Sequence, residues 1–213
     1  MQRSAQRVGC FISIDGIDGA GKTTQQRLLA EWLESQGWSV VCCRDPGSTA
    51  LGDQLRRLLL EQPGVSISLL SEMFLYMAAR AQLIEELIRP ALGEGRMVIC
   101  DRFLLANVAY QGYGGGLDVE QLWQVGRIAV QGILPQLTIV LDLPVPEGLR
   151  RRGEQQDRIE SRGATFLERV RQGYLTEAAR HPDSIRVVRA DQPVEAVADQ
   201  IRGQVSQFLS ATV

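Results

Sequence analysis

The chain has 213 residues, of which 45% are apolar and 23% are charged, and its formal net charge is −2. This length and composition suit one α/β domain over residues 1–213, and the near-neutral charge argues against a general nucleic-acid or membrane-surface binder. No apolar run approaches 18 residues, and the first residues lack the apolar segment of a secretory signal. The four cysteines form no CxxC pair, which favours buried apolar roles over metal or redox roles. We therefore expect a cytoplasmic protein.

The first predicted elements flank a glycine-rich loop. Residues 9–15 are a short apolar run typical of a buried strand, and residues 24–35 place apolar side chains at helical spacing. Between them, residues 16–23 match Gly-x-x-x-x-Gly-Lys-Ser/Thr, the phosphate-binding P-loop. Strand, loop and helix follow in the order that this motif requires. The sequence therefore predicts a nucleotide-binding loop and not an ordinary glycine turn.

The residue types of this loop explain how it binds nucleotide. Backbone N–H groups surround the phosphate oxygens, which glycines permit because they carry no side chain. Lys22 reaches the β- and γ-phosphates, and the hydroxyl of Thr23 ligates Mg²⁺. Lys22 is the only lysine among the 23 basic residues of the chain. The predicted ATP-binding residues of the loop are Gly16, Ile17, Asp18, Gly19, Ala20, Gly21, Lys22, Thr23 and Thr24.

Strands and helices continue to alternate downstream. Apolar runs predict further strands at 39–44, 97–101, 137–142 and 185–189, and helical periodicity predicts helices at 51–59, 69–89, 119–131, 164–180 and 194–209. Pro90 allows a kink or a restart near the end of the longest helix. Asp118 and Gln121 are spaced as a capping box for the helix that follows them.

This alternation predicts a five-stranded parallel sheet covered by helices on both faces. In such sheets, ligands bind beyond the carboxyl ends of the strands. The P-loop, Asp45, Asp101 with Arg102, and Asp142 all stand at those ends. We expect the chemistry of the protein to lie along this one edge.

Six segments together resemble the thymidylate kinase family. They are residues 11–24, 44–49, 76–82, 101–103, 107–112 and 157–160. The resemblance runs from about residue 9 to residue 210. It implies a fold like that of P-loop nucleotide hydrolases with a short lid at about 150–163. It also implies phosphorylation of dTMP to dTDP, in dTTP synthesis, with Mg²⁺ and ATP.

The resemblance assigns the phosphate and metal contacts. Arg44 and Arg102 match family positions that hold the dTMP phosphate, and guanidinium groups suit this role because they donate in pairs to phosphate oxygens. Ordinary ion pairs are the alternative for both arginines. Asp101 resembles the acidic residue of the family that positions Mg²⁺ together with Thr23. The alternative is that Asp101 only orients Arg102. The predicted catalytic residues are Lys22, Asp101, Arg102 and Arg158.

The resemblance also assigns a pocket for the nucleoside. Tyr76 would stack on thymine, Arg80 would donate to thymine O4, and Asn107 would contact the other edge of the base. Tyr76 and Arg80 are four residues apart and share one helix face, although a plain core aromatic is the alternative for Tyr76. Tyr110, followed by Gln111, would crowd the 2′ position and disfavour ribonucleotides.

Two further assignments concern the loop and the lid. The acid at Asp18 would bind the 3′-hydroxyl of the deoxyribose. Because Gly19 leaves the P-loop without a second basic side chain, an arginine of the lid would stabilise the transferred phosphoryl group. Arg158 is the first candidate and Arg152 the second, and an ordinary solvated charged face is the alternative for this stretch.

Other functions remain to be compared with this one. A kinase of the same architecture acting on dUMP, AMP or a deoxynucleoside is disfavoured by Arg80, Asn107 and Tyr110 together. A catalytically idle nucleotide-binding protein would have no use for Lys22 and Asp101. The resemblance further implies a homodimer, and the apolar faces of 69–89 and 119–131 are candidates for its interface.

Overall fold

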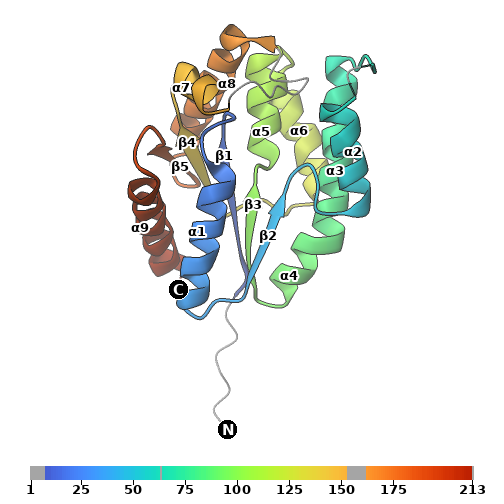
Figure 1. The fold of residues 1–213 in the computed structure, drawn as a ribbon. Helices are drawn as coiled ribbons and strands as arrows, with labels where there is room; N and C mark the ends of the chain where they lie inside the picture. Colours follow the sequence, from blue (N-terminus) through green and yellow to red (C-terminus); the bar gives the residue numbers. More distant parts are fainter. Residues whose placement is uncertain (1–7, 63, 153–161, 213) are drawn as a thin grey trace.

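The computed structural model describes residues 8–62, 64–152 and 162–212, and it contains a five-stranded parallel sheet (Figure 1). The strands are β1 (Cys10–Gly16), β2 (Val40–Arg44), β3 (Met97–Asp101), β4 (Leu137–Asp142) and β5 (Ile185–Arg189). Their order across the sheet is β2-β3-β1-β4-β5, and every neighbouring pair is parallel. The five predicted strands are thus confirmed, each to within one residue at either end.

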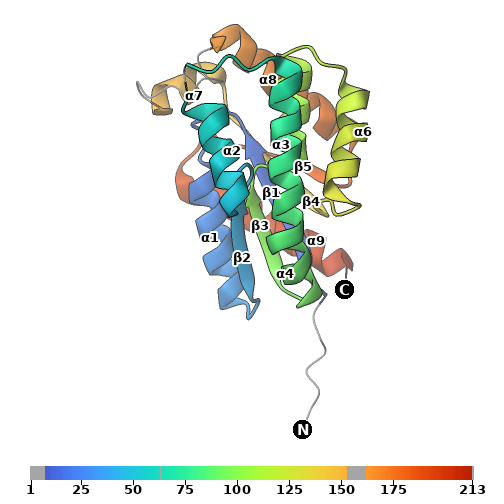
Figure 2. The same ribbon diagram turned by 90° about the vertical axis from the view of Figure 1, so that its right-hand side faces the viewer.

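Helices cover both faces of the sheet, as predicted. They are α1 (Lys22–Ser35), α2 (Ala50–Leu60), α3 (Leu69–Leu83), α4 (Arg89–Gly93), α5 (Leu104–Asn107), α6 (Val119–Val130), α7 (Val145–Arg152), α8 (Ala164–Arg180) and α9 (Val194–Thr212), with π-helical segments η1 (Ile84–Ile88) and η2 (Val108–Gly114). Helices α1 and α9 pack together on one face, and α4, α5 and α8 contact the strands from the other. Helices α2, α3 and α6 form a further layer at the side of the β2–β3 edge (Figure 2).

Side-chain caps fix where several helices begin. Thr49 and Ser68 accept hydrogen bonds from backbone N–H groups in the first turns of α2 and α3. Asp118 accepts from the Gln121 N–H at 2.8 Å, so the Asp118 half of the predicted capping box of α6 is confirmed. The long predicted helix 69–89 differs from the expectation, because α3 ends at Leu83 and η1 intervenes before Pro90 enters the first turn of α4. The π-helical pairing lets the chain continue past a residue that lacks an N–H donor.

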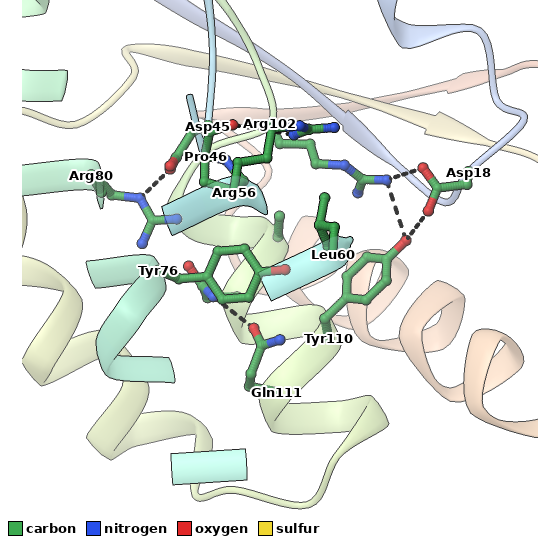
Figure 3. Close-up of a pocket in the computed structure, with 12 residues that line it drawn as sticks. Asp18, Asp45, Pro46, Arg56, Leu60, Tyr76, Arg80, Arg102, Tyr110 and Gln111 are labelled. Carbon is green, nitrogen blue, oxygen red and sulfur yellow. Dashed lines mark hydrogen bonds and ion pairs between the residues drawn. The ribbon is translucent and has the colours of Figure 1, made fainter. Parts of the chain in front are cut away.

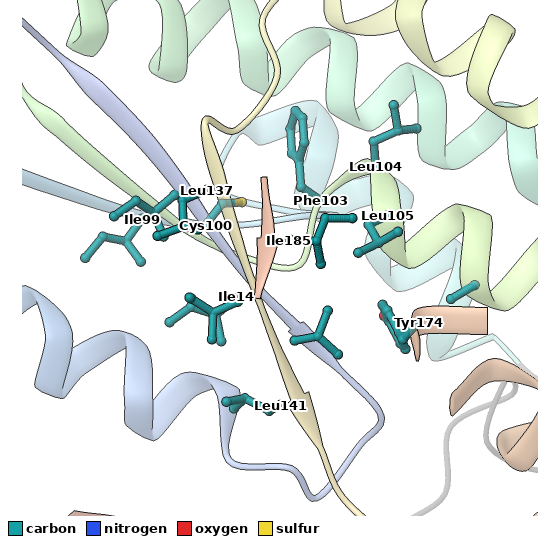
Figure 4. Packing of buried hydrophobic residues seen from close by; sticks show 14 of the residues in the cluster. Ile14, Ile99, Cys100, Phe103, Leu104, Leu105, Leu137, Leu141, Tyr174 and Ile185 are labelled. Atoms are coloured by element: carbon teal, nitrogen blue, oxygen red, sulfur yellow. The ribbon is translucent and has the colours of Figure 1, made fainter. Parts of the chain in front are cut away.

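The core lies between the central strands and the helices of both layers. Every residue of β1 is buried, and Ile14, Ile99 and Leu141 from three adjacent strands lie among the packed side chains in Figure 4. The edge strand β2 is less covered, and Cys42 in it is exposed, whereas the other three cysteines are buried as expected. No helix in the described part of the chain is long and apolar enough to cross a membrane.

The topology itself locates the functional edge. Strand β1 lies at the centre, and the chain reverses its direction of travel across the sheet there, since β3 adjoins it on one side and β4 on the other. The crevice at such a switch point is the ordinary ligand site of open parallel sheets. The P-loop, which follows β1, occupies this point.

Candidate active site

The P-loop closes around its lysine. Lys22 is buried, and its Nζ donates to Ile17 O at 2.9 Å and lies 3.4 Å from Asp18 Oδ1. Burial, followed by the nearby cation of Arg102, lowers the pKa of Lys22. A phosphate group that enters the loop would counter both effects, because it supplies negative charge to a cation with little solvent. Lys22 is thus a buried cation at the P-loop, and its contact with nucleotide phosphates stays a prediction.

Gly19 is required by packing as well as by backbone conformation. Its φ is +80°, and a Cβ at this position would lie 2.5 Å from the carbonyl oxygen of Gly148 in α7. No L side chain fits this space without moving α7, from which the lid stretch continues. A basic side chain at position 19 of the P-loop is therefore excluded sterically by α7.

The candidate metal ligands lie together. Thr23 Oγ1 donates to Asp101 Oδ2 at 2.7 Å, joining the first turn of α1 to the end of β3. These oxygens fit Mg²⁺, which takes one or two protein oxygens and completes its shell with water and substrate phosphates. Among the described residues, no cluster of three or more His, Cys, Asp or Glu side chains suited to a metal occurs.

Arg102 links the P-loop to the acceptor side of the site. Its backbone has φ +67°, which turns the side chain back across β1, where it donates to Gly16 O at 2.9 Å and to Asp18 Oδ1 at 2.5 Å. Its guanidinium lies 5.1 Å from the ring centroid of Tyr110, whose hydroxyl donates to Asp18 Oδ2 at 3.3 Å. Burial opposes the charge of Arg102, but Asp18 and the two neighbouring tyrosines raise its pKa well above the ordinary value. Three of the four residues predicted to contact the dTMP phosphate and sugar, Asp18, Arg102 and Tyr110, thus form one cluster.

A third arginine joins the two that the sequence indicated. Arg44 pairs with Asp53 at 3.2 Å and is exposed, and it lines a cavity of about 570 Å³ together with Arg102 and the P-loop. Arg56, in α2, lines the same cavity and donates to Pro46 O at 3.1 Å. Burial, then Arg44 and Arg102, lower the pKa of Arg56. Two guanidinium groups that repel a third beside one cavity favour the binding of an anion there.

The pocket predicted for the nucleoside opens beside this cavity. Tyr76, Arg80, Tyr110 and Gln111 line it (Figure 3), and Asn107 lines it with them. Arg80 is buried and donates through Nε to Asp45 Oδ2 at 2.5 Å, while its guanidinium stacks 5.3 Å from the ring of Phe103. Asn107 Nδ2 donates to Gln111 Oε1 at 2.6 Å.

The lid assignments lie mostly outside the described residues. Arg158 is not among them, and of Arg152 only the backbone in α7 is described. Three other arginines of this stretch are described: Arg150 pairs with Glu147 at 2.7 Å, Arg151 lines the phosphate cavity, and Arg162 donates to the buried Glu72 at 2.6 Å.

Sequence reasoning missed Arg56 and Glu72. Arg56 lies on the polar face of an ordinary amphipathic helix, next to the similar Arg57, and no local pattern separates the two. Glu72 stands in the first turn of α3, where an acidic residue is common for helix stability alone. Only the packing of these helices against the site distinguishes them.

A phosphate-binding loop, converging arginines and a pocket for a planar base lie along one cleft in a one-sheet α/β fold. This combination defines the class of P-loop kinases that phosphorylate nucleoside monophosphates.

Comparison with known proteins identifies the family within that class. The family model for thymidylate kinase matches residues 14–201. Among curated relatives, the thymidylate kinase of Rhodopirellula baltica is 46% identical over 91% of this chain and 78% of its own length, and that of Symbiobacterium thermophilum is 44% identical over 93% and 94%. A crystal structure of thymidylate kinase from Ehrlichia chaffeensis matches with a TM-score of 0.75 and 32% identity, over 92% of this chain and 98% of that one. The chain belongs to the thymidylate kinase family.

Proposed function

We propose that this thymidylate kinase binds ATP in the P-loop and dTMP along the adjoining cleft, with the residue roles set out below. The assignment of the reaction, ATP-dependent phosphorylation of dTMP to dTDP, rests on membership of the family. The residue roles rest on one observation: the nucleoside pocket and the phosphate cavity share Asp18, Asp45, Arg56 and Arg102. A nucleotide lying across these shared residues would have its base beside Tyr76 and its phosphate directed toward Lys22.

The acceptor is held at three points. Arg44, Arg56 and Arg102 bind the 5′-phosphate, whose negative charge relieves the repulsion among them. Asp18 accepts from the 3′-hydroxyl, and Tyr110, which bonds Asp18, occupies the space beside the 2′ carbon. Because Asp18 also belongs to the P-loop, acceptor and donor positions are mechanically linked.

The base is recognised by an aromatic face and two polar edges. Tyr76 stacks on the ring, Arg80 donates to O4, and Asn107 contacts N3, with Gln111 supporting Asn107. The ion pair with Asp45 fixes the direction of Arg80 donors. A base with the wrong hydrogen-bonding edge leaves buried groups unpaired, which discriminates strongly.

Phosphoryl transfer is performed by positioning and charge. Lys22 and the loop N–H groups hold the ATP phosphates, while Arg102 holds the attacking phosphate oxygen in line. Thr23 and Asp101 would hold Mg²⁺, which would supply positive charge to stabilise the phosphates in the transition state. An arginine of the predicted lid stretch, at about 150–163, would stabilise the transferred group, with Arg158 the first candidate and Arg152 the second. The steric limit at Gly19 supports a lid source for that charge.

We also propose that the protein is a single-domain homodimer of the cytoplasm. Leu70 and Phe74 on α3 are each 53% exposed, and Ile128 on α6 is 78% exposed. Helices α3 and α6 lie side by side (Figure 2). A face of this kind is stabilised by burial in a partner copy. The four cysteines are free, which suits a reducing compartment. Sedimentation of wild type against Phe74→Glu tests the dimer, which the charged variant should disrupt.

An ADP-release assay tests the acceptor assignment. With Mg²⁺ and ATP, dTMP should stimulate turnover strongly, dUMP weakly, and AMP, GMP, CMP and thymidine not at all. Lys22→Ala should abolish turnover with an unchanged circular dichroism spectrum. Equal stimulation by dTMP and CMP would refute the roles of Arg80 and Asn107.

A further inference from the structure

A buried glutamate lies behind the nucleoside pocket and does not line it. Glu72, in the first turn of α3, has no solvent exposure. Its Oε1 accepts from Gln111 Nε2 at 2.9 Å, and its Oε2 accepts from Arg162 at 2.6 Å. Burying a carboxylate is costly unless it is paired and hydrogen-bonded. Both oxygens of Glu72 therefore act as acceptors.

The carboxylate determines which way two amides point. Gln111 must turn its NH₂ group toward Glu72, since a carboxylate offers only acceptors. Its Oε1 then faces Asn107 and accepts from Asn107 Nδ2 at 2.6 Å (Figure 3 marks this bond to Gln111). Each step leaves a single orientation for the next amide.

The chain ends in an acceptor at the pocket. Asn107 is 2% exposed and lines the nucleoside pocket, and no donor among the described residues bonds its Oδ1. A buried carbonyl oxygen without a donor is costly and is satisfied when a ligand supplies one. Thymine carries such a donor at N3, whereas cytosine carries a lone pair there.

We propose that Glu72 is a positioning residue that determines base specificity by fixing the orientation of Gln111 and Asn107. The inference rests on the proposed contact between Asn107 and N3 of the base. Glu72 touches neither substrate, and its effect is to make Asn107 an acceptor. The pocket then selects a base with an N3–H donor, as in dTMP, and rejects a base with an N3 acceptor, as in 5-methyl-dCMP.

Glu72→Gln tests the inference because it should reverse the whole chain. Arg162 can only donate, so it takes the oxygen of the new glutamine and leaves the NH₂ group facing Gln111. Gln111 and Asn107 then both turn over, and Asn107 presents a donor to the base. The ratio of kcat/KM for dTMP to that for 5-methyl-dCMP should fall by about tenfold or more. With dTMP the variant loses a buried hydrogen bond to N3–H, and with 5-methyl-dCMP the mismatch at N3 is removed. Most of the loss with dTMP should appear in KM, with kcat largely retained.

Two variants separate positioning from a merely structural role. Glu72→Asp keeps an acceptor-only side chain and should retain the preference for dTMP, even where its affinity changes. Glu177→Gln alters another fully buried glutamate, which accepts from Tyr113 at 2.7 Å and Trp123 at 3.0 Å, away from the nucleoside pocket. It should lower the melting temperature without changing the substrate ratio.

The outcomes are distinct. An unchanged ratio in Glu72→Gln, alongside a reduced ratio in Asn107→Leu, would overturn the role of Glu72 and keep the base contact of Asn107. An unchanged ratio in both would refute the base contact itself. If Glu72→Gln does not fold, Gln111→Met interrupts the same chain, and a ratio unchanged in that variant overturns the inference. Where turnover of 5-methyl-dCMP is too slow, its inhibition constant against dTMP replaces kcat/KM in the ratio.

Discussion

Replacing Arg56 by methionine should weaken dTMP binding without weakening nucleoside binding. Arg56 lines both the phosphate cavity and the nucleoside pocket, and Arg44 and Arg102 repel it in the free enzyme. A hydrogen bond to a charged group contributes about 1.5–3 kcal/mol. At 1.4 kcal/mol for each factor of ten, loss of this contact raises KM for dTMP about 10- to 150-fold. Methionine retains much of the apolar stem, so the fold should be preserved.

The assay compares two ligands and two variants. KM for dTMP is measured at saturating ATP, and thymidine, which has no phosphate, is measured as a competitive inhibitor. The inhibition constant of thymidine should be unchanged in Arg56→Met. Arg57→Met is the matched control, because Arg57 is the next residue of α2, is exposed, and lines neither cavity. Equal weakening of dTMP and thymidine, or an equal effect of both substitutions, would refute the phosphate contact.

Three more predictions address the loop, the sugar and the sheet. Gly19→Ala should lower the free energy of unfolding by about 1–3 kcal/mol and reduce turnover, because the new Cβ would clash with Gly148 at a positive φ. The control Gly203→Ala in α9 places its Cβ in open space and should be neutral or stabilising. A melting temperature of Gly19→Ala equal to that of wild type would contradict this prediction. Tyr110→Ala should admit ribonucleotides, so its ratio of kcat/KM for dTMP to that for the ribonucleotide should fall, and an unchanged ratio removes Tyr110 from 2′ discrimination. Burial raises the pKa of Asp15 to about 6, despite the opposing charge of Arg102, so the folded state binds a proton that the unfolded state has released. The stability that Asp15 contributes below about pH 4 is therefore lost as pH rises to about 6. In urea unfolding, the free energy of unfolding of Asp15→Asn should gain on the order of 3 kcal/mol relative to wild type between these pH values. Parallel pH profiles of the two free energies would rule out this effect of Asp15.

Much of the site could be predicted because its chemistry is local in sequence. The P-loop needs its glycines and Lys22 at fixed spacing, so the motif alone identifies them. Tyr76 and Arg80 share a helix face at i and i+4, and Asp101 and Arg102 stand at a strand end, where parallel topology directs ligands. These residues meet in the structure because the strand order brings β3 beside β1.

Other parts could not be predicted because they depend on contacts between distant segments. Gly19 occupies a variable position of the motif, and its necessity comes from Gly148, more than one hundred residues later. The single helix expected over 69–89 is divided by η1, and periodicity does not report that the backbone pairing changes after Leu83. Helix α7 begins within a proline-containing stretch and has no periodicity long enough to detect.

The sequence by itself determined the class of fold, the phosphate loop and the family, because strand alternation, motif spacing and segment resemblance are properties of neighbouring residues. Tertiary structure alone decided that Arg56 rather than Arg57 reaches the phosphate cavity, since that depends on how α2 packs against α3. It also decided that Glu72, Gln111 and Asn107 form one hydrogen-bonded chain, in which bonded partners are up to 39 positions apart in the sequence. The orientation of a buried amide is set by the hydrogen-bond partners packed beside it, and these partners come together only in the folded structure.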